Sequence, residues 1–423
     1  MEYIFAAIKT VLIFVAVINL VPLLIWLERK GAAYIQDRRG PNRANILGIR
    51  LGGLIHSLSD VVKLLTKEDI IPPYVNKPFY LLAPMISMFV ATITVAVVPF
   101  ADPILINGKE FLLQVADLDA GLLYVFAASS LGVYGIMLAG WAANNKYSLL
   151  GGLRSAAQMV SYEMSLGLAV VGVFLLTGSF KLSEIVAFQG ANPFHWNILL
   201  QPLGFFLFVT SIFAETNRLP FDLPEGESEI VAGYHVEYSS MKFALFFMAE
   251  YAHIVVGSCI IVTLFLGGWH FPFLTRDWIW NHTTMLIHLF WIVLAILSVA
   301  GGTWLVWQYK PHKYNDLRDY ETLVFGVPGI IVGGSLLMTW LLFHTVVPLE
   351  IPTPDWVRQA MVTALQLGTF VGKVLFVCFV FIWVRWTLPR FRYDQVMRLG
   401  WKMMLPLALA NIFITAGMIL IFR

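Results

Sequence analysis

The densest group of side chains that could do proton chemistry lies between two long apolar segments, in residues 214–240. This stretch, AETNRLPFDLPEGESEIVAGYHVEYSS, contains one arginine, Arg218, no lysine, and six carboxylates: Glu215, Asp222, Glu225, Glu227, Glu229 and Glu237. Carboxylates crowded near low-dielectric protein repel one another and share protons, so some of their pKa values rise as a coupled set. Such a set can take up and release protons near neutral pH.

A solvated acidic loop is the simpler interpretation of this charge run, but two features oppose it. Apolar residues such as Phe221, Ile230 and Tyr234 alternate with the acids, which indicates that the loop packs against protein. The sequence ETNRLP also follows the preceding apolar segment directly, and Pro220 then prevents the helix from continuing. We therefore expect a packed acidic loop over residues 215–242.

Further ionisable residues lie inside the apolar segments themselves. Glu163 is about five residues, or roughly 8 Å, inside one segment, and Lys373 is near the middle of another. Glu250 and His253 are three positions apart and can share a helix face. A charge at the bilayer centre costs at least about 2.5–3.5 kcal/mol, so such residues face a bundle interior and a partner. They form either ion pairs that fix helix packing or a proton or ion relay, and their combination with the acidic loop favours a relay.

Composition supplies the elements that must position these charges. The 423 residues are 59% hydrophobic and only 13% charged, with a mean hydropathy of +0.76, whereas soluble domains are about 25% charged. Apolar runs of about 20 residues match the length that a helix needs to cross a bilayer. We expect a single all-α, polytopic membrane domain over residues 1–423, with about ten helices: 4–26, 79–99, 120–141, 158–177, 196–214, 243–266, 284–307, 323–347, 362–384 and 403–422.

The distribution of basic residues predicts the topology. Alternate loops hold 21 of the 28 lysines and arginines: 28–78, 142–157, 215–242, 308–322 and 385–402. Loops rich in Lys and Arg face the cytoplasm. We therefore expect cytoplasmic long loops, both termini on the outer side, and, for a bacterial chain, the inner membrane.

The first long loop, residues 28–78, carries nine Lys or Arg and contains a predicted amphipathic helix at 52–65. Its apolar positions follow helical spacing: Leu54, Ile55, Leu58, Val61, Val62 and Leu65. The helix either lies on the lipid headgroups or roofs a cavity that opens on the cytoplasmic side. The sequence leaves both interpretations open.

Several signatures of chemistry are missing. The chain has no phosphate-binding glycine loop, no dinucleotide fingerprint and no HExxH motif. Cys259 and Cys378 fall in apolar runs and form no metal-binding pattern. We expect no catalytic residue, metal, bound cofactor or nucleic-acid partner for this chain, which therefore cannot transfer electrons by itself.

The residues described above also carry a family resemblance. The matching stretches are WLERK (26–30), RGPNR (39–43), DVVKLLTKEDIIP (60–72), residues 140–163, residues 213–251 and residues 383–402. They resemble the H membrane subunit of proton-pumping NADH:quinone oxidoreductase, respiratory complex I, whose mitochondrial counterpart is NADH dehydrogenase subunit 1.

The resemblance implies a role in a quinone chamber and a proton path. Positions near the chamber are Arg29, Asp60, Arg154, Glu215, Glu225, Glu227 and Glu229, to which we add Arg218, the base of the acidic loop. The carboxylates that begin a proton path are Glu163, Glu237 and Glu250, to which we add the intramembrane Lys373. Quinone would be the substrate, whereas FMN and the iron–sulfur clusters would belong to partner subunits. The implied partners are the hydrophilic-arm subunits with the terminal iron–sulfur cluster, small membrane subunits, antiporter-like subunits and lipids.

Two departures from the family pattern stand out. Residues 275–360 appear as an inserted helical hairpin, two helices more than the usual eight, and His56-Ser57 replaces the usual Gln-Pro. Two other functions also remain open. One is the homologous anchor of a membrane-bound hydrogenase-type, ion-pumping complex without quinone, and the other is a stand-alone transporter, for which the related halves are not found.

Overall fold

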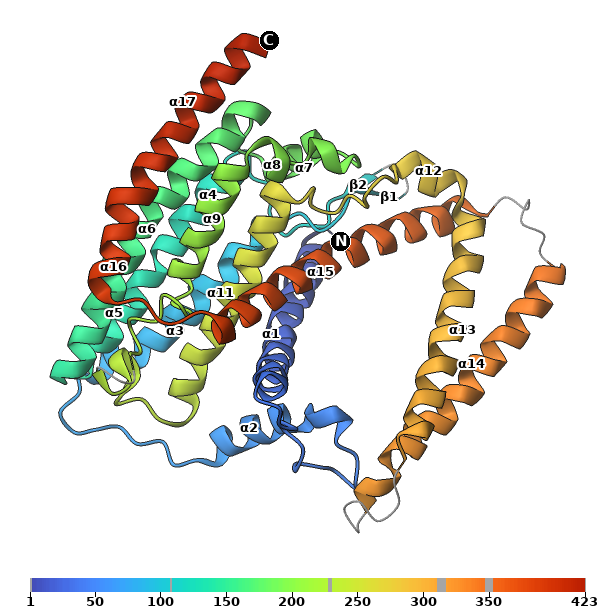
Figure 1. Cartoon of the computed structure of the whole chain (residues 1–423), viewed down its shortest axis with the longest axis horizontal. Coiled ribbons are helices and arrows are strands. Elements are labelled where there is room, and N and C mark those ends of the chain that lie inside the picture. The colour runs from blue at the N-terminus through green and yellow to red at the C-terminus, as the bar shows by residue number, and fades with distance from the viewer. Residues whose placement is uncertain (1, 107–108, 227–229, 310–316, 347–352, 423) are drawn as a thin grey trace.

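The computed structural model describes residues 2–106, 109–226, 230–309, 317–346 and 353–422. Figure 1 shows a bundle of tilted helices with one helical pair standing to its side. Within the described residues, nine helices are long and apolar enough to cross a membrane. The predicted all-α, multi-pass membrane fold is therefore confirmed.

The long helices follow the predicted spans in order. They are α1 (Glu2–Ile35), α3 (Lys77–Ile93), α4 (Gly121–Ser130) with α5 (Gly132–Ala142), α6 (Lys146–Thr177), α9 (Pro202–Glu215), α11 (Ser240–Phe265), α13 (Thr283–Trp307), α14 (Glu321–Val346), α15 (Asp355–Thr387) and α17 (Leu405–Phe422). Short helical elements connect them: η1 (Leu51–Gly53), α2 (Ile55–Thr66), η2 (Thr94–Val97), α7 (Leu182–Gln189), η3 (Pro193–His195), α8 (Asn197–Leu200), η4 (Gly233–His235), α12 (Arg276–Asn281), η5 (Leu317–Tyr320), α16 (Tyr393–Arg398) and the π-helical η6 (Leu399–Met404). Strands β1 (Ile104–Ile106) and β2 (Lys109–Phe111) form a small antiparallel pair.

Two predicted spans have different bounds in the structure. Helix α6 begins at Lys146, twelve residues before the predicted start at 158, so Glu163 lies about 26 Å along the helix. Helix α9 has only 14 residues, fewer than a full span requires. The irregular backbone before α9 is enclosed by protein, because the buried Gln201 donates to Thr415 and accepts from Asn411 on α17. Non-helical backbone is tolerated at membrane depth under those conditions.

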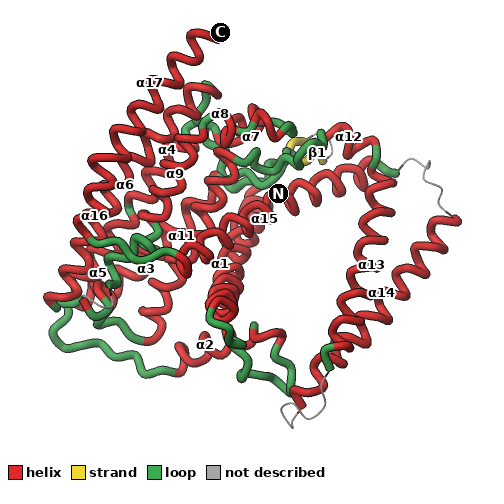
Figure 2. The backbone as a smooth tube through the Cα atoms, in the orientation of Figure 1, coloured by secondary structure: helices red, strands yellow, loops and turns green. Residues whose placement is uncertain are grey.

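Most of the charged loops lie at one end of the bundle, which we call the charged end. It comprises residues 36–76, 216–226 and 230–239 together with the adjoining helix ends, and Figure 2 shows the loops among them in green. Helix α1 begins and α17 ends at the opposite end of the bundle (Figure 1). The predicted alternation of the chain is thus present, while the side of the membrane that the charged end faces stays a prediction.

Helix α11 forms the centre of the protein core. It packs against α1, α3, α9 and α15. In its apolar 18-residue stretch, 78% of the residues are buried. Phe265 contacts Phe205 and Phe208 of α9, with ring centroids 5.4 and 5.5 Å apart. Any charge that α11 carries at its inner positions is therefore surrounded by protein and not by lipid.

Helices α13 and α14 form an antiparallel pair that stands apart from α1 in Figure 1. The two helices approach closely through glycine, because a Cβ added to Gly302 would lie only 2.7 Å from the Gly326 carbonyl oxygen. In the apolar 18-residue stretches of α13 and α14, only 17% and 11% of the residues are buried. Whether this pair is an insertion relative to the family stays a prediction.

Glycine also allows α6 to contact the acidic loop, which predicts a stability effect. A Cβ on Gly151 would lie 2.7 Å from both the Gly233 Cα and the Tyr234 nitrogen. We expect Gly151→Ala to destabilise the protein by about 1–3 kcal/mol, as overpacking does. The thermal unfolding temperature of the purified protein measures this effect.

The matched control is Gly167→Ala on the same helix, where an added Cβ meets nothing within 4 Å. Alanine is favoured over glycine inside a helix, so this variant should unfold at the same or a higher temperature. Equal unfolding temperatures for the two variants would contradict the proposed close contact.

Candidate functional site

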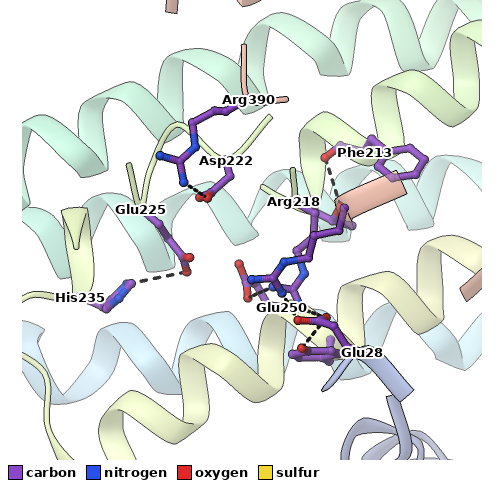
Figure 3. A network of polar contacts seen from close by, with 11 residues as sticks. Glu28, Phe213, Arg218, Asp222, Glu225, His235, Glu250 and Arg390 are labelled. Carbon is purple, nitrogen blue, oxygen red and sulfur yellow. Dashed lines mark hydrogen bonds and ion pairs between the residues drawn. The ribbon is translucent and has the colours of Figure 1, made fainter. Parts of the chain in front are cut away.

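A buried group of charged side chains lies where the acidic loop meets the helix ends (Figure 3). The Arg218 guanidinium contacts Glu28 at 3.1 Å and Glu250 at 3.5 Å, and it lies 4.3 Å from the centre of the Tyr251 ring. Arg385 contacts the other oxygen of Glu28. We call these five residues the Arg218 cluster. Two carboxylates and two guanidinium groups give it a net charge near zero when all four are ionised.

The Arg218 cluster is assembled from four distant parts of the chain. Glu28 lies in the last turns of α1, Arg218 in the acidic loop, Glu250 and Tyr251 in α11, and Arg385 in the last turn of α15. The Arg218 side chain is only 5% exposed. A charge buried this deeply requires partners with good geometry, since removing one of them leaves an uncompensated charge.

The two carboxylates of the cluster differ in their hydrogen bonds. Glu28 accepts from Arg218, from Arg385 and, at 2.7 Å, from the Tyr251 hydroxyl. By contrast, Oε2 of Glu250 has no hydrogen-bond donor among the described residues, although Arg218 lies 3.5 Å away. Glu28 is therefore held in place by hydrogen bonds, whereas Glu250 is held by the charge of Arg218.

A second group lies farther along the acidic loop. Asp222 accepts a hydrogen bond from Arg390 at 2.6 Å, while its other oxygen is buried without a donor in the described part of the chain. Burial and the nearby Glu225 raise the pKa of Asp222 to about 6, against the opposing effect of Arg390. Glu225 lies 3.9 Å from the His235 ring nitrogen (Figure 3). Glu227 and Glu229, which the sequence also nominates, lie outside the described residues.

Glu163 and Glu215 lie deeper, among α4, α6 and α9. Ser130 at the end of α4 donates its hydroxyl hydrogen to Glu163. Glu215, the last residue of α9, lines a cavity of about 30 Å³ together with Ser129 and His253. That volume is close to the space one water molecule occupies. The cavity thus places Glu215 beside polar groups of α4 and α11.

Glu237 lies on the other side of the acidic loop, away from the Arg218 cluster. Its carboxylate accepts hydrogen bonds from Tyr74 at 2.8 Å and from Asn145 at 2.7 Å. The Tyr80 hydroxyl donates to its backbone carbonyl at 2.7 Å. These contacts connect the acidic loop to the end of the first loop and to the start of α6.

The other predicted chamber residues lie at the rim of the charged end. Arg29 at the end of α1 pairs with Asp60 on α2 at 2.5 Å, and these side chains are 44% and 30% exposed. Arg154 on α6 lies 6.0 Å from the centre of the Tyr393 ring. Most apolar positions of α2 remain exposed, including Leu58 and Leu65. The choice between a headgroup helix and a roof therefore stays open.

An ion pair is one of the two roles that the sequence leaves open for charges in the apolar helices, and for Lys373 it requires a carboxylate partner. Instead, its ammonium group donates to the backbone carbonyls of Leu266, Gly268 and His270 at 2.7, 3.0 and 2.8 Å. It also lies 4.2 Å from the centre of the Trp196 ring. Lys373 thus caps the turn that follows α11, far from the Arg218 cluster, because its three N–H donors match three backbone carbonyls there.

Sequence reasoning missed several members of the site. Glu28 and Arg385 flank apolar runs, where a charge is ordinary, and so neither was nominated. Their signal was present in the WLERK and WVRW stretches that carry the family resemblance. Tyr251 and Arg390 gave no signal beyond lying beside a nominated residue or in a basic loop.

The fold and this site together define a multi-pass membrane protein whose interior holds a series of protonatable groups. The family model described as NADH dehydrogenase matches residues 8–315 and 324–416. The chain belongs to that family.

Curated relatives match nearly the whole chain. The H 1 subunit of the NADH-quinone oxidoreductase of Solibacter usitatus is 41% identical, and the alignment covers 97% of this chain and 96% of the relative. The H 2 subunit of the Koribacter versatilis oxidoreductase is 40% identical with the same coverage. The H 1 subunit of the Cytophaga hutchinsonii oxidoreductase is 38% identical over 93% of this chain and 91% of the relative.

The carbonyl contacts of Lys373 predict the effect of removing its charge. Lys373→Met would leave three carbonyls in the turn after α11 without this donor. We expect a loss of about 1–3 kcal/mol in stability, the usual cost of unsatisfied buried polar groups. The thermal unfolding temperature of the purified protein measures it. Lys402→Met is the control, because Lys402 is exposed, and an unfolding temperature of Lys373→Met equal to that of Lys402→Met would contradict the capping role.

The raised pKa of Asp222 predicts a titration near pH 6. Its folded pKa of about 6 lies above the ordinary value of 3.8. Between these values the folded chain keeps a proton that the unfolded chain releases, so this carboxyl's stabilising contribution falls as pH rises through 6. Infrared difference spectra should show a carboxyl band that disappears near pH 6 and is absent from Asp222→Asn.

Arg390→Gln provides the second arm of this experiment. Arg390 lowers the pKa of Asp222, so its replacement should move the midpoint of the band to a higher pH. A band that titrates near pH 4 in both proteins would contradict the assignment.

Proposed function

We propose that this membrane subunit of an NADH-quinone oxidoreductase forms part of the quinone chamber and couples quinone reduction to proton movement. The family match, the names of the relatives and the apolar helices indicate a multi-pass membrane subunit of such an oxidoreductase. The position and chemistry of the charged site support its proposed roles in the quinone chamber and in coupling.

The observation that carries the proposal is the Arg218 cluster beneath the acidic loop. Reduction of a quinone to a quinol takes up two electrons and two protons. Asp222, whose pKa is raised to about 6, can take up and release a proton near neutral pH, and Glu225 lies close enough to contribute to this shift. Asp222 and Glu225 lie four and seven residues after Arg218 in the chain. A change of charge at the quinone would therefore act directly on the cluster.

The Arg218 cluster in turn offers a way to transmit that change of charge from the quinone to the membrane interior. Arg218 contacts both Glu28 and Glu250. Glu28 accepts three hydrogen bonds, whereas Glu250 makes only a charge contact with Arg218 among the described residues. Loss of negative charge from the acidic loop would shift the balance of Arg218 between the two carboxylates and alter the free energy of a proton on Glu250. Glu215, three residues before Arg218, and Glu163 would continue the path across the membrane interior. Proton transfer along such a coupled set is a property of the set and not of one residue.

We further propose the surroundings that this role requires. The charged end would face the cytoplasm and bind the hydrophilic-arm subunits that hold FMN and the iron–sulfur clusters. Small membrane subunits and antiporter-like subunits would receive the proton path on the membrane side. Electrons would reach quinone from the partner's clusters, and this chain would hold the quinone and the protons.

Co-purification with activity assays tests the proposal. This chain is isolated from gently solubilised native membranes, its partners are identified by mass spectrometry, and NADH-dependent reduction of a short-chain quinone is measured. We expect an FMN- and iron–sulfur-containing arm and quinone reductase activity. A nickel–iron hydrogenase partner without quinone reduction would overturn the proposal in favour of an anchor for ion coupling alone.

Replacing one carboxylate of the proposed proton path tests whether quinone reduction is coupled to proton movement. Glu163→Gln keeps the hydrogen-bond acceptor for Ser130 but cannot carry a proton. We expect the complex to assemble, whereas quinone-linked proton pumping should fall by roughly 100-fold or more, the contribution typical of a positioned proton donor or acceptor. Proton uptake by membrane vesicles, driven by NADH oxidation, measures it.

Glu184→Gln is the control for this experiment, because Glu184 is an exposed carboxylate in the first turn of α7. It should pump at the normal rate. Normal pumping by Glu163→Gln as well would remove Glu163 from the path. The same test applies to Glu227→Gln, which the sequence nominates for the chamber.

A further inference from the structure

An ion pair joins the helical pair α13–α14 to the first loop at the charged end. The carboxylate of Glu321, the first residue of α14, accepts two hydrogen bonds from Arg50. One comes from the Arg50 backbone N–H at 2.9 Å and the other from its Nε at 2.6 Å. The two side chains are only 11% and 10% exposed. The carboxylate also lies at a helix N-terminus, where the helix dipole favours negative charge.

The part of the first loop that receives this contact has a costly backbone conformation. Leu47 and Leu51 have positive φ angles of 50° and 48°, which residues other than glycine rarely adopt. Ile46 and Ile49 exchange backbone hydrogen bonds at 3.0 Å, and Arg50 also donates to Asn42 at 2.7 Å. Surrounding contacts must hold such a segment in place. We call residues 42–53 the Arg50 segment.

The Arg50 segment leads directly into α2. Trp26 of α1 donates to the Gly52 carbonyl at 3.2 Å, and Ser57 of α2 donates to the Pro22 carbonyl at 3.0 Å. Asp60 on α2 then pairs with Arg29. The conformation of the Arg50 segment therefore sets where α2 begins and how the Arg29–Asp60 pair is presented.

The far end of the helical pair is anchored separately. Helix α12, which precedes α13, packs on α15, and Ile279 of α12 is buried. Arg358 of α15 lies 6.0 Å from the centre of the Trp280 ring. With Glu321 at the other end, the α13–α14 pair extends from α15 to the first loop and is attached at both ends (Figure 1).

We propose that the α13–α14 pair is a brace for the first loop, and that Arg50 and Glu321 are positioning residues for the mouth of the quinone chamber. The chamber rests on the proposed function, whereas the brace itself rests on the contacts above. Without Glu321, the Arg50 segment loses the acceptor of a backbone N–H and the partner of a buried guanidinium group. The segment then relaxes from its strained conformation, and α2 with the Arg29–Asp60 pair loses its fixed position.

Hydrogen–deuterium exchange of the assembled complex tests the brace. In Glu321→Leu, the backbone amides of Ile46, Ile49 and Arg50 should exchange roughly 10- to 100-fold faster, as expected from loss of a charge-assisted hydrogen bond. Ile331→Ala is the control, because Ile331 is on α14 and 65% exposed, and it should leave these amides unchanged. Unchanged exchange in Glu321→Leu, or equally faster exchange in Ile331→Ala, would overturn the proposal.

A double-mutant cycle covers the case in which Glu321→Leu fails to assemble. Arg50→Gln and Glu321→Gln each remove one charge, and the double variant leaves no unpaired charge. Glu321→Gln keeps the side-chain size, whereas Arg50→Gln shortens the side chain. The double variant should exchange no faster than the faster of the single variants, since both act on one interaction. Fully additive effects would show that the two residues act separately and would overturn the pairing.

The kinetics of quinone reduction test the positioning role of the brace separately from the proposed chamber. In Glu321→Gln the KM for a short-chain quinone should rise about tenfold with kcat nearly unchanged, while NADH oxidation by a water-soluble acceptor stays normal. A lower kcat with an unchanged KM would overturn the positioning role. If wild-type protein shows no quinone reduction but the exchange results hold, the brace stands and the chamber assignment fails.

Discussion

The burial of one guanidinium group is the constraint on which the arrangement of this protein depends. Moving an ion such as Arg218 from water into a protein interior costs several kcal/mol unless partners replace its hydration. Glu28, Glu250 and Tyr251 supply those partners from two different helices. The last turns of α1 and α15 and the inner part of α11 must therefore converge at the place where the acidic loop folds back into the bundle. The chamber that we propose is a consequence of this convergence.

The carboxylates of the site differ in their hydrogen bonds. Glu28 is held by three donors, whereas one oxygen each of Glu250 and Asp222 is buried without a donor in the described structure. Groups of the second kind can gain a proton without losing a hydrogen bond. In the role that we propose, protonation changes at Asp222 in the loop and at Glu250 in the cluster, and Arg218 conveys the change of charge between them.

Local signals made much of this predictable from the sequence. A bilayer dictates helix length, and a charge within an apolar run stands out against its neighbours, which is why Glu163, Glu250 and Lys373 were found. Partner choice has no such local signal, and so Arg385 was missed and the backbone carbonyls that hold Lys373 were not predicted. The start of α6 was also missed, because a helix that packs against protein can begin with residues such as Gly151 and Arg154, which are too polar or too small for an apolar run.

The wide separation of Glu28 and Arg385 in the chain has a consequence for biogenesis. Their positions differ by 357 residues, and at the usual rate of translation Arg385 is made on the order of tens of seconds after Glu28. Helix α1 enters the membrane long before its partners exist, so Glu28 must wait in water at the membrane surface. The bundle can close around this residue only after α15 has been inserted. A nascent chain that stops before α15 therefore contains Arg218 and Tyr251 as donors to one oxygen of Glu28 but lacks Arg385, the donor to the other.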